Sequence, residues 1–318
     1  METKNGVKIF GGTFILFFIS LSILSGCGLF EKGKKDNSNG NQTQMQKFTD
    51  IFTKPPLFDS SKQKYSAGKS RIYPKSSSVS VWEKVIIGNY NGTFYANSIT
   101  QSSDGGYVVA GNSFGEVFGE LSNWDIYVAK LDSEGNVVWS KAIGGSGMDF
   151  ASSIIQSSDG GYVVAGGTDS FGAGYSDMFV VKLDSEGNVQ WAKTIGGSYN
   201  DGALSIIQSS DGGYVVAGGT SSFGAGSADI YVVKLDSGGN VEWTKTIGGS
   251  GWDKALSIIQ SSDGGYVVAG YTESFGAGYA DFYVVKMDAN GNICFSQNIT
   301  NYSVSSNVGS FLSPSTVA

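Results

Sequence analysis

Apolar and polar residues follow one another along residues 81–318 in short segments of strand length. Around the middle of the chain, an apolar segment at 151–157 is followed by the polar sequence Ser-Asp-Gly-Gly and by a second apolar run at 162–167. A third run spans 178–183, and a fourth, at 189–195, alternates with a period of two. Short runs of this kind, separated by glycine-rich turns, predict β-strands. The pattern predicts four strands here, and no segment has the length and period of a helix.

The same four-strand pattern occurs four times along the chain. The sequence Gln-Ser-Ser-Asp-Gly-Gly-Tyr-Val-Val-Ala-Gly begins at Gln101, Gln156, Gln208 and Gln260. The copies are 52 residues apart, except that a three-residue insertion lengthens the first spacing to 55. An internal period near 50 residues with four strands per unit indicates propeller blades. We therefore predict an all-β fold, a β-propeller of four four-stranded blades of about 52 residues within residues 81–300.

The two ends of the repeat region bear on whether the ring closes. Residues 81–88 match a fourth strand and add an extra N-terminal strand that no third strand precedes. The last repeat has its own fourth strand at 293–299, in which Phe295 and Gln297 replace the repeated Trp and Lys. We predict that the strand of Trp82 occupies the closing position. The alternatives are an open array, or a homo-oligomer in which two arrays complete one ring.

The repeated motifs resemble those of a known repeat family. Tyr-Val-Val-Ala-Gly-Gly-Thr at 162–168 is followed by Asp-Met-Phe-Val-Val-Lys-Leu-Asp-Ser-Glu-Gly-Asn-Val-Gln-Trp at 177–191 and then by Ile-Gly-Gly. This set resembles the SBBP-type β-propeller repeat of bacterial and archaeal surface proteins, and it is similar to kelch and quinoprotein-like repeats. The resemblance covers residues 82–299 and implies the propeller fold. Propellers host many unrelated activities, so it does not imply one function.

The N-terminal residues have the pattern of an export signal. Lys4 and Lys8 precede an apolar stretch at 14–24, which is too short to cross a bilayer as a helix but suits the core of a signal peptide. The stretch ends in Leu-Ser-Gly-Cys at 24–27, which resembles the lipobox of bacterial lipoproteins. The resemblance implies cleavage after residue 26 and lipidation of Cys27. An ordinary secretory leader with a chance cysteine is the alternative.

Charge divides the rest of the chain. Residues 28–80 are polar and carry ten Lys and Arg against four Asp and Glu, whereas residues 81–318 carry nine Lys against 23 Asp and Glu. A polar segment of like charge cannot bury enough apolar surface to fold, so residues 27–80 are predicted to be a disordered, lipid-anchored linker. Residues 301–318 form a C-terminal tail. The expected location is the cell envelope, at the outer membrane or cell surface, with the membrane as partner of the anchor.

Several kinds of chemistry are excluded by composition. The chain has no histidine, which removes Ser-His-Asp and Cys-His catalysis, and its two cysteines cannot form an all-cysteine zinc site. No phosphate-binding loop occurs, and the Asp-Ser-Glu-Gly-Asn turn lacks the residue order of a calcium loop. An acidic body repels nucleic acid. We expect no cofactor, no metal, no nucleic-acid partner and no enzyme activity; a glycosidase with paired carboxylates is the less favoured alternative.

Candidate binding residues are those that differ between the copies. Residues repeated in every copy, such as Phe171, Trp191, Asp177 and Asp201, are expected to maintain blade geometry and to cap loop amides. The copy-specific residues on the side of the longer loops are Glu116, Glu120 and Trp124 in the insertion, and Tyr199 and Trp252 in loops that join successive repeats. Aromatic rings beside carboxylates suit sugars. We predict a non-catalytic binding module for a glycan or protein ligand, with a scaffold for envelope protein assembly as the alternative.

Overall fold

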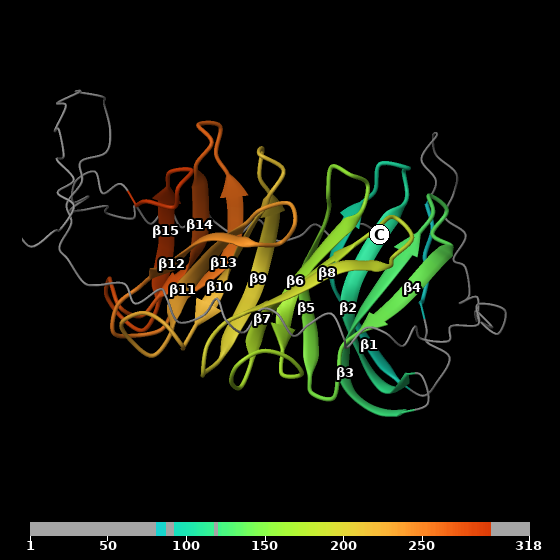
Figure 1. Cartoon of the computed structure of the whole chain (residues 1–318), viewed down its shortest axis with the longest axis horizontal. Helices are drawn as coiled ribbons and strands as arrows, with labels where there is room; N and C mark the ends of the chain where they lie inside the picture. The colour runs from blue at the N-terminus through green and yellow to red at the C-terminus, as the bar shows by residue number, and fades with distance from the viewer. Residues whose placement is uncertain (1–80, 87–91, 118–119, 294–318) are drawn as a thin grey trace, which may run out of the picture. The chain divides into compact units, whose positions relative to one another are not determined.

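A computed structural model describes residues 81–86, 92–117 and 120–293 (Figure 1). The predicted signal peptide, Cys27, the linker, residues 294–299 of the predicted fourth strand of the last repeat, and the C-terminal tail lie outside the described residues. Ile293, the first residue of that predicted strand, forms an antiparallel bridge with Met287. Within the described part, no helix that is long and apolar enough to span a membrane is found. The described residues form four antiparallel sheets in which neighbouring strands are consecutive along the chain.

Each sheet corresponds to one sequence repeat. The first sheet contains β1 (Thr93–Gln101), β2 (Tyr107–Val117), β3 (Glu120–Leu131) and β4 (Val137–Ile143). The second contains β5 (Asp149–Gln156), β6 (Tyr162–Thr168), β7 (Asp177–Leu183) and β8 (Val189–Ile195). The third contains β9 (Asp201–Gln208), β10 (Tyr214–Thr220), β11 (Asp229–Leu235) and β12 (Val241–Ile247). The fourth contains β13 (Asp253–Gln260), β14 (Tyr266–Thr272) and β15 (Asp281–Met287). The prediction of propeller blades is confirmed in these sheets.

The insertion of the first repeat extends a hairpin instead of forming a loop. Strands β2 and β3 continue beyond the length of their equivalents, and Glu116 pairs with Leu121 while Val117 pairs with Glu120. The register shifts between Phe114 and Glu116, so a β-bulge absorbs the irregularity. The extra residues therefore lengthen two existing strands of the first sheet.

A buried lysine ties the third strand to the first turn in each of the first three sheets. In the second sheet, the Lys182 ammonium donates hydrogen bonds to Ser157 Oγ at 2.6 Å and to Asp159 Oδ1 at 2.7 Å. Burial opposes ionisation of Asp159, but the hydrogen bonds from Lys182 and Ser157 outweigh it and lower the pKa of Asp159 to about 2. The turn itself needs Gly160, whose φ is +85°. Lys130 and Lys234 make the same ion pair in their own sheets.

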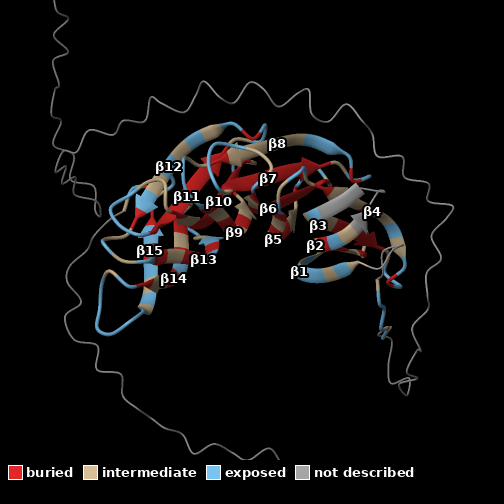
Figure 2. Cartoon of the chain, turned by 90° about the horizontal axis from the view of Figure 1, so that it is seen from below, coloured by how far each residue is buried: buried red, intermediate tan, exposed pale blue. Residues whose placement is uncertain are grey.

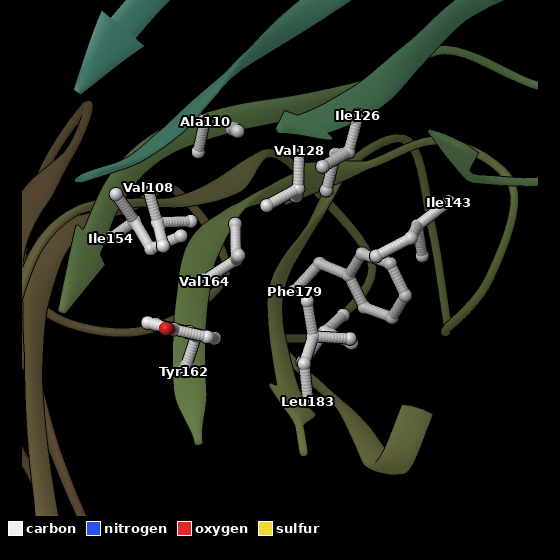
Figure 3. Packing of buried hydrophobic residues seen from close by; sticks show 12 residues of the cluster. Val108, Ala110, Ile126, Val128, Ile143, Ile154, Tyr162, Val164, Phe179 and Leu183 are labelled. Carbon is white, nitrogen blue, oxygen red and sulfur yellow. The ribbon is translucent and has the colours of Figure 1, made fainter. Parts of the chain in front are cut away.

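The apolar core lies between sheets. The first strand of each sheet contacts the first three strands of the sheet before it. Figure 3 shows this core between the first two sheets, where Val108 and Val128 lie near Ile154, Tyr162 and Val164. We call the side of a sheet that packs on the preceding sheet its leading face, and the opposite side its trailing face. In the second sheet the leading face comprises Ala151, Ile154, Tyr162, Val164, Phe179, Val181 and Leu183, and the trailing face comprises Val163, Ala165, Met178, Val180 and Ile195.

Burial along the strands shows which sheets have neighbours on both faces. All seven residues of β7 and all seven of β11 are buried, because these strands lie in interior sheets. In β15, which has the same sequence pattern, only Val285 and Met287 are buried. Figure 2 shows the contrast between the red strands of the interior sheets and the blue and tan β15. An apolar strand is therefore buried here by the following sheet, and not by its own sheet alone.

Polar clamps reinforce each contact between sheets. Gln156 of the second sheet accepts a hydrogen bond from the Ser103 N–H at 2.8 Å and donates one to Ser103 Oγ at 3.2 Å. Gln208 and Gln260 bind Ser158 and Ser210 in the same way. The Trp139 indole N–H donates to the Ser185 carbonyl at 3.0 Å, so the tryptophan of one sheet docks on a turn of the next.

The prediction that Trp82 closes the ring from the last sheet is wrong for this chain. Residues 81–86 form no strand, and the Trp82 indole N–H donates to the carbonyl of Ser133 in the first sheet at 3.0 Å. The Trp82 ring also makes an edge contact with Tyr107, with 5.7 Å between the ring centroids. Residues 81–86 therefore pack on the first sheet, because the Trp82 ring docks on the turn that contains Ser133. Trp139 docks in the same way on the turn of the second sheet that contains Ser185.

The paired glycines that end the second strand have different roles, which gives a test of the fold. A Cβ on Gly166 would lie 1.7 Å from the carbonyl oxygen of Phe150, where β5 bulges, whereas a Cβ on Gly167 would lie 3.5 Å from Ser176 Oγ. We expect Gly166→Ala to lower the free energy of unfolding by about 3 kcal/mol, because the backbone of β5 must move. Gly167→Ala, the matched control, should change it by less than about 0.5 kcal/mol. Equal losses in urea unfolding would contradict this assignment.

Candidate functional site

The strongest candidate site is a cleft on the side of the longer loops. It has a volume of about 310 Å³ and lies at the junction of the third and fourth sheets. Its lining residues are Ser176, Asn200, Asp201, Gly202, Leu204, Gly219, Thr220, Ser221, Ala228, Trp252 and Lys254. The lining combines one indole with an amide, hydroxyls and an ammonium group, whereas its one carboxylate, Asp201, is buried and caps a loop amide. Such a surface offers a stacking face and both donors and acceptors of hydrogen bonds.

The backbone fixes Trp252 at the edge of this cleft. The Trp252 carbonyl accepts a hydrogen bond from the Glu273 N–H at 2.8 Å, and Trp252 forms a parallel bridge with Ala228. The preceding Gly251 N–H donates to Ser274 Oγ at 2.9 Å. With its backbone held in this way, the indole is still 51% exposed. A rigid loop thus presents an aromatic ring to solvent at no further ordering cost.

The loops that join successive sheets show how Trp252 arises from the repeat. The carbonyl groups of Met148, Asn200 and Trp252 accept equivalent hydrogen bonds, so these three residues are equivalent. Tyr199 corresponds instead to Gly147 and Gly251, because the N–H group at each of these positions donates to the serine of the following loop. Tyr199 and Trp252 therefore occupy positions that differ by one residue in their loops.

The five predicted binding residues do not form one site. Trp124 lies in β3 of the first sheet and stacks with Tyr95, with ring centroids 5.6 Å apart, and with Phe114 at 5.2 Å. Glu116 and Glu120 lie in the extended hairpin of the same sheet, and their side chains are outside the described part. Tyr199 is exposed between the second and third sheets and does not line the cleft. Of the five, only Trp252 lines the cleft.

Two cleft residues escaped the sequence analysis. Asn200 takes the position of Met148 and Trp252, and Lys254 takes the position of Phe150 and Gly202, so both vary between copies. That variation was a usable signal. It was not sufficient by itself, because only the packing of the third sheet against the fourth brings Asn200 and Lys254 to the same cleft.

The repeated aspartates cap loop amides, as expected. Asp177 Oδ2 accepts a hydrogen bond from the Ala173 N–H at 2.6 Å, and Asp201 Oδ2 accepts from the Gly197 N–H at 2.7 Å. Their Oδ1 atoms are buried and have no donor among the described residues. The two carboxylates face each other across Gly196, on which a Cβ would lie 1.9 Å from Asp177 Oδ1 and 2.6 Å from Asp201 Oδ2. Burial, and secondarily the charge of Asp201, raise the pKa of Asp177 to about 6.

A second hollow lies on the side of the short turns. It has a volume of about 550 Å³ and is lined by the serine-rich turns and by Gln156 and Gln208. The amide groups of both glutamines already bind serines of the preceding sheet and carbonyl groups of their own turns. Because these polar groups already bind one another, this hollow is a weaker candidate than the cleft at Trp252.

The comparisons with known proteins support the class of fold. Residues 209–242 and 261–294 match a family model described as a domain of unknown function (DUF5122) beta-propeller. Together with the four sheets, this match defines the described region as β-propeller repeats. A regulatory protein of Caulobacter vibrioides, FlaEY, is 30% identical over 138 residues, which cover 38% of this chain and 14% of that protein. The chain therefore spans a small part of the length of this relative.

Similar solved structures are distant in sequence and geometry. A protein of unknown function from Bacteroides caccae is 10% identical with a TM-score of 0.34, covering 67% of this chain and 83% of that chain. The WD40 domain of Pan2 from Neurospora crassa is 15% identical with a TM-score of 0.38, covering 63% of this chain and 64% of that chain. Similarities at this level do not assign a function.

The aspartate pair predicts a pH dependence of stability. A carboxyl group with a pKa of about 6 in the folded protein and 3.8 when unfolded holds a proton that the unfolded chain has lost. Its contribution is fully present below pH 4 and is lost as the pH rises through about 6. We expect Asp177→Asn to remove this residue's share of the decline and to stabilise the protein at pH 8 by about 1–2 kcal/mol, since a neutral amide keeps the hydrogen bond to Ala173. Asp125, whose pKa burial also raises to about 6, keeps its own share.

Urea unfolding between pH 4 and pH 8 measures this effect. The matched control is Asp184→Asn, in a turn where burial opposes ionisation but the hydrogen bonds from Asn188 and Glu186 together outweigh it and lower the aspartate pKa. Asp184 is ionised in both states above pH 4, so its replacement should leave the decline unchanged. A decline as steep in Asp177→Asn as in the unmodified protein would contradict the assignment to this pair.

Proposed function

We propose that this protein is a cell-envelope lipoprotein whose β-propeller repeats form a non-catalytic module that binds a glycan at the cell surface. The observation that carries the proposal is the cleft of about 310 Å³ with the half-exposed indole of Trp252 at its edge. Asn200 and Lys254 supply hydrogen-bonding groups around it. A sugar ring presents an apolar face for stacking and hydroxyls for such groups.

The proposed location rests on the N-terminal sequence. The apolar stretch at 14–24 followed by Leu-Ser-Gly-Cys is the pattern of a lipoprotein signal, and residues 28–80 provide a polar tether between Cys27 and the first sheet. Lipid anchoring places the propeller repeats outside the cytoplasm, where glycans and envelope proteins are the available ligands. The excess of 23 acidic residues over nine lysines in residues 81–318 favours these ligands over nucleic acid.

The proposed absence of catalysis rests on the burial and the hydrogen bonds of the facing carboxylates. A glycosidase needs two carboxyl groups that flank the scissile bond of its substrate. The facing pair Asp177 and Asp201 is 2% exposed at each residue, and one oxygen of each caps a loop amide. These groups therefore serve the loops and are closed to a sugar. The sequence also supplies no histidine as a general acid or base.

Glycan binding through the cleft can be tested with the full chain on a glycan array and by titration of the positive glycans. We expect Trp252→Ala to weaken binding at least about tenfold, because the stacking face is lost. Tyr175→Ala is the matched control, because Tyr175 is exposed but does not line the cleft. Thermal unfolding of both variants should match the unmodified protein.

Three results would contradict the proposal. Glycan binding that survives Trp252→Ala would exclude this cleft as the glycan site. Silence of the array, together with specific capture of envelope proteins that Trp252→Ala abolishes, would favour the scaffold function. Glycan turnover lost on a single Asp or Glu substitution would overturn the non-catalytic assignment.

The lipid anchor predicts a change of location. Cys27→Ser removes the thiol that would be acylated, and we expect the protein to move from the membrane fraction to the soluble extracytoplasmic fraction. Each buried CH₂ of an acyl chain contributes about 0.8 kcal/mol to membrane binding, so the loss should be complete. Cys294→Ser is the matched control and should leave the protein with the membrane. Membrane retention of Cys27→Ser would contradict the anchor.

A further inference from the structure

The first and last sheets expose the faces that interior sheets bury. Ile99 in β1, on the leading face of the first sheet, is 61% exposed, whereas the equivalent Ile154 is 3% exposed. Val284 in β15, on the trailing face of the fourth sheet, is 64% exposed, whereas the equivalent Val180 is fully buried. Phe282, two residues before Val284 on the same face, is completely exposed. Each end of the array therefore carries an apolar sheet face without a partner among the described residues.

These two faces are complementary because they repeat the pair of faces that pack on each other inside the chain. Within the chain, a trailing face packs on a leading face three times, and the residue types at each position recur. The leading face of the first sheet includes Ile99, Tyr107 and Val109, which correspond to Ile258, Tyr266 and Val268 in the buried leading face of the fourth sheet. The leading face of the first sheet therefore fits a trailing face like that of the third sheet. The fourth sheet has an exposed trailing face of this kind.

The N-terminal segment already occupies part of such an interface. The Trp82 indole donates to the Ser133 carbonyl at 3.0 Å, and Lys84 donates to Asn136 Oδ1 at 3.1 Å. Trp139 and Lys141 of β4 make the same two contacts with the next sheet, to Ser185 and Asn188. Residues 81–86 therefore lie where the fourth strand of a preceding sheet belongs.

The sequence indicates which fourth strand belongs at this interface. The fourth strand of the last repeat has Phe295 and Gln297 in place of the Trp and Lys that dock on a following sheet. Residues 81–86 retain both, as Trp82 and Lys84. The segment equipped to join the fourth sheet to a following first sheet is thus the N-terminal one.

We propose that two copies of this chain associate head to tail. The trailing face of the fourth sheet of one copy packs on the leading face of the first sheet of the other, and residues 81–86 of the partner subunit pair with β15 to complete a four-stranded sheet. Two such junctions join eight sheets, which is within the usual range of propeller blades, and leave no apolar face open. A head-to-tail contact that closes in this way limits assembly to the dimer.

The proposed junction also has a specific polar contact. Each interior junction is clamped by a glutamine at the end of a first strand and a serine in the preceding sheet, as in Gln156 with Ser103. The corresponding residues at the ends of the array are Gln101 and Ser262. In the dimer Gln101 of one copy binds Ser262 of the partner subunit.

Light scattering of the full chain tests the assembly. Cys27→Ser is included in every protein, so that an acyl chain cannot drive association. The proposal predicts twice the mass of the chain, and a single-chain mass for both Ile99→Asp and Val284→Asp, because each junction uses one of each residue. Val138→Asp is the matched control, since Val138 is 61% exposed in β4 and lies at neither end face. It should stay dimeric.

Mixing the two monomeric variants separates head-to-tail from other dimers. Ile99→Asp and Val284→Asp together have one unmodified pair of faces, so the mixture should form heterodimers. A single-chain mass of the Cys27→Ser protein up to its solubility limit would overturn the proposal, and would indicate that residues 294–318 or the linker cover the faces. A dimer that survives Ile99→Asp would overturn the head-to-tail arrangement.

Cross-linking tests the register. In a chain without Cys27 and Cys294, Gln101→Cys with Ser262→Cys should give a covalent dimer with a short bismaleimide. The matched pair Gln156→Cys with Ser103→Cys sits at an interior junction and should cross-link within one chain, which shows that the reagent spans this distance. Cross-linking of the interior pair without a covalent dimer from the terminal pair would overturn the proposed junction.

Discussion

The packing of one sheet on the next is the contact on which this structure depends. Each repeat makes a sheet that is apolar on both faces, and a single sheet of this kind cannot shield either face from water. The leading face of one sheet covers the trailing face of the sheet before it, with Tyr162 and Val164 against Val108 and Val128 in the first junction. This explains why β7 and β11 are buried along their full length whereas β15, with nearly the same sequence, is largely exposed.

Local interactions prepare each sheet for that packing. The Lys182 ammonium holds the Ser-Asp-Gly-Gly turn against the third strand, and Gly166 lets the bulge of β5 approach the second strand. The Gln–Ser and Trp–turn contacts then fix how far and at what register the next sheet lies. Because these contacts recur, the array is rigid enough to hold variable loop residues in fixed positions, and Trp252 is one of them.

Function in this protein belongs to the differences between copies. The residues common to all repeats form turns, cap loop amides or make the contacts between sheets. Asp177 and Asp201, for example, cap loop amides. The cleft at Trp252 forms because Asn200 and Lys254 replace other side chains at repeated positions and meet at one junction. The differences between copies point to Trp252 but group it with Trp124 in the first sheet and Tyr199 in the loop between the second and third sheets.

The sequence by itself determined the repeat, the four strands of each unit and the turns, because these depend on periods of two residues and on glycine at fixed positions. It also determined that repeated aspartates and tryptophans are structural. Three features depend on tertiary packing: the docking of Trp82 on the first sheet, the lengthening of a hairpin by the insertion, and the set of variable residues that share a cleft. These outcomes depend on which sheet lies next to which, and sequence periodicity carries no information on that contact at the ends of the array, where a repeat has only one neighbour.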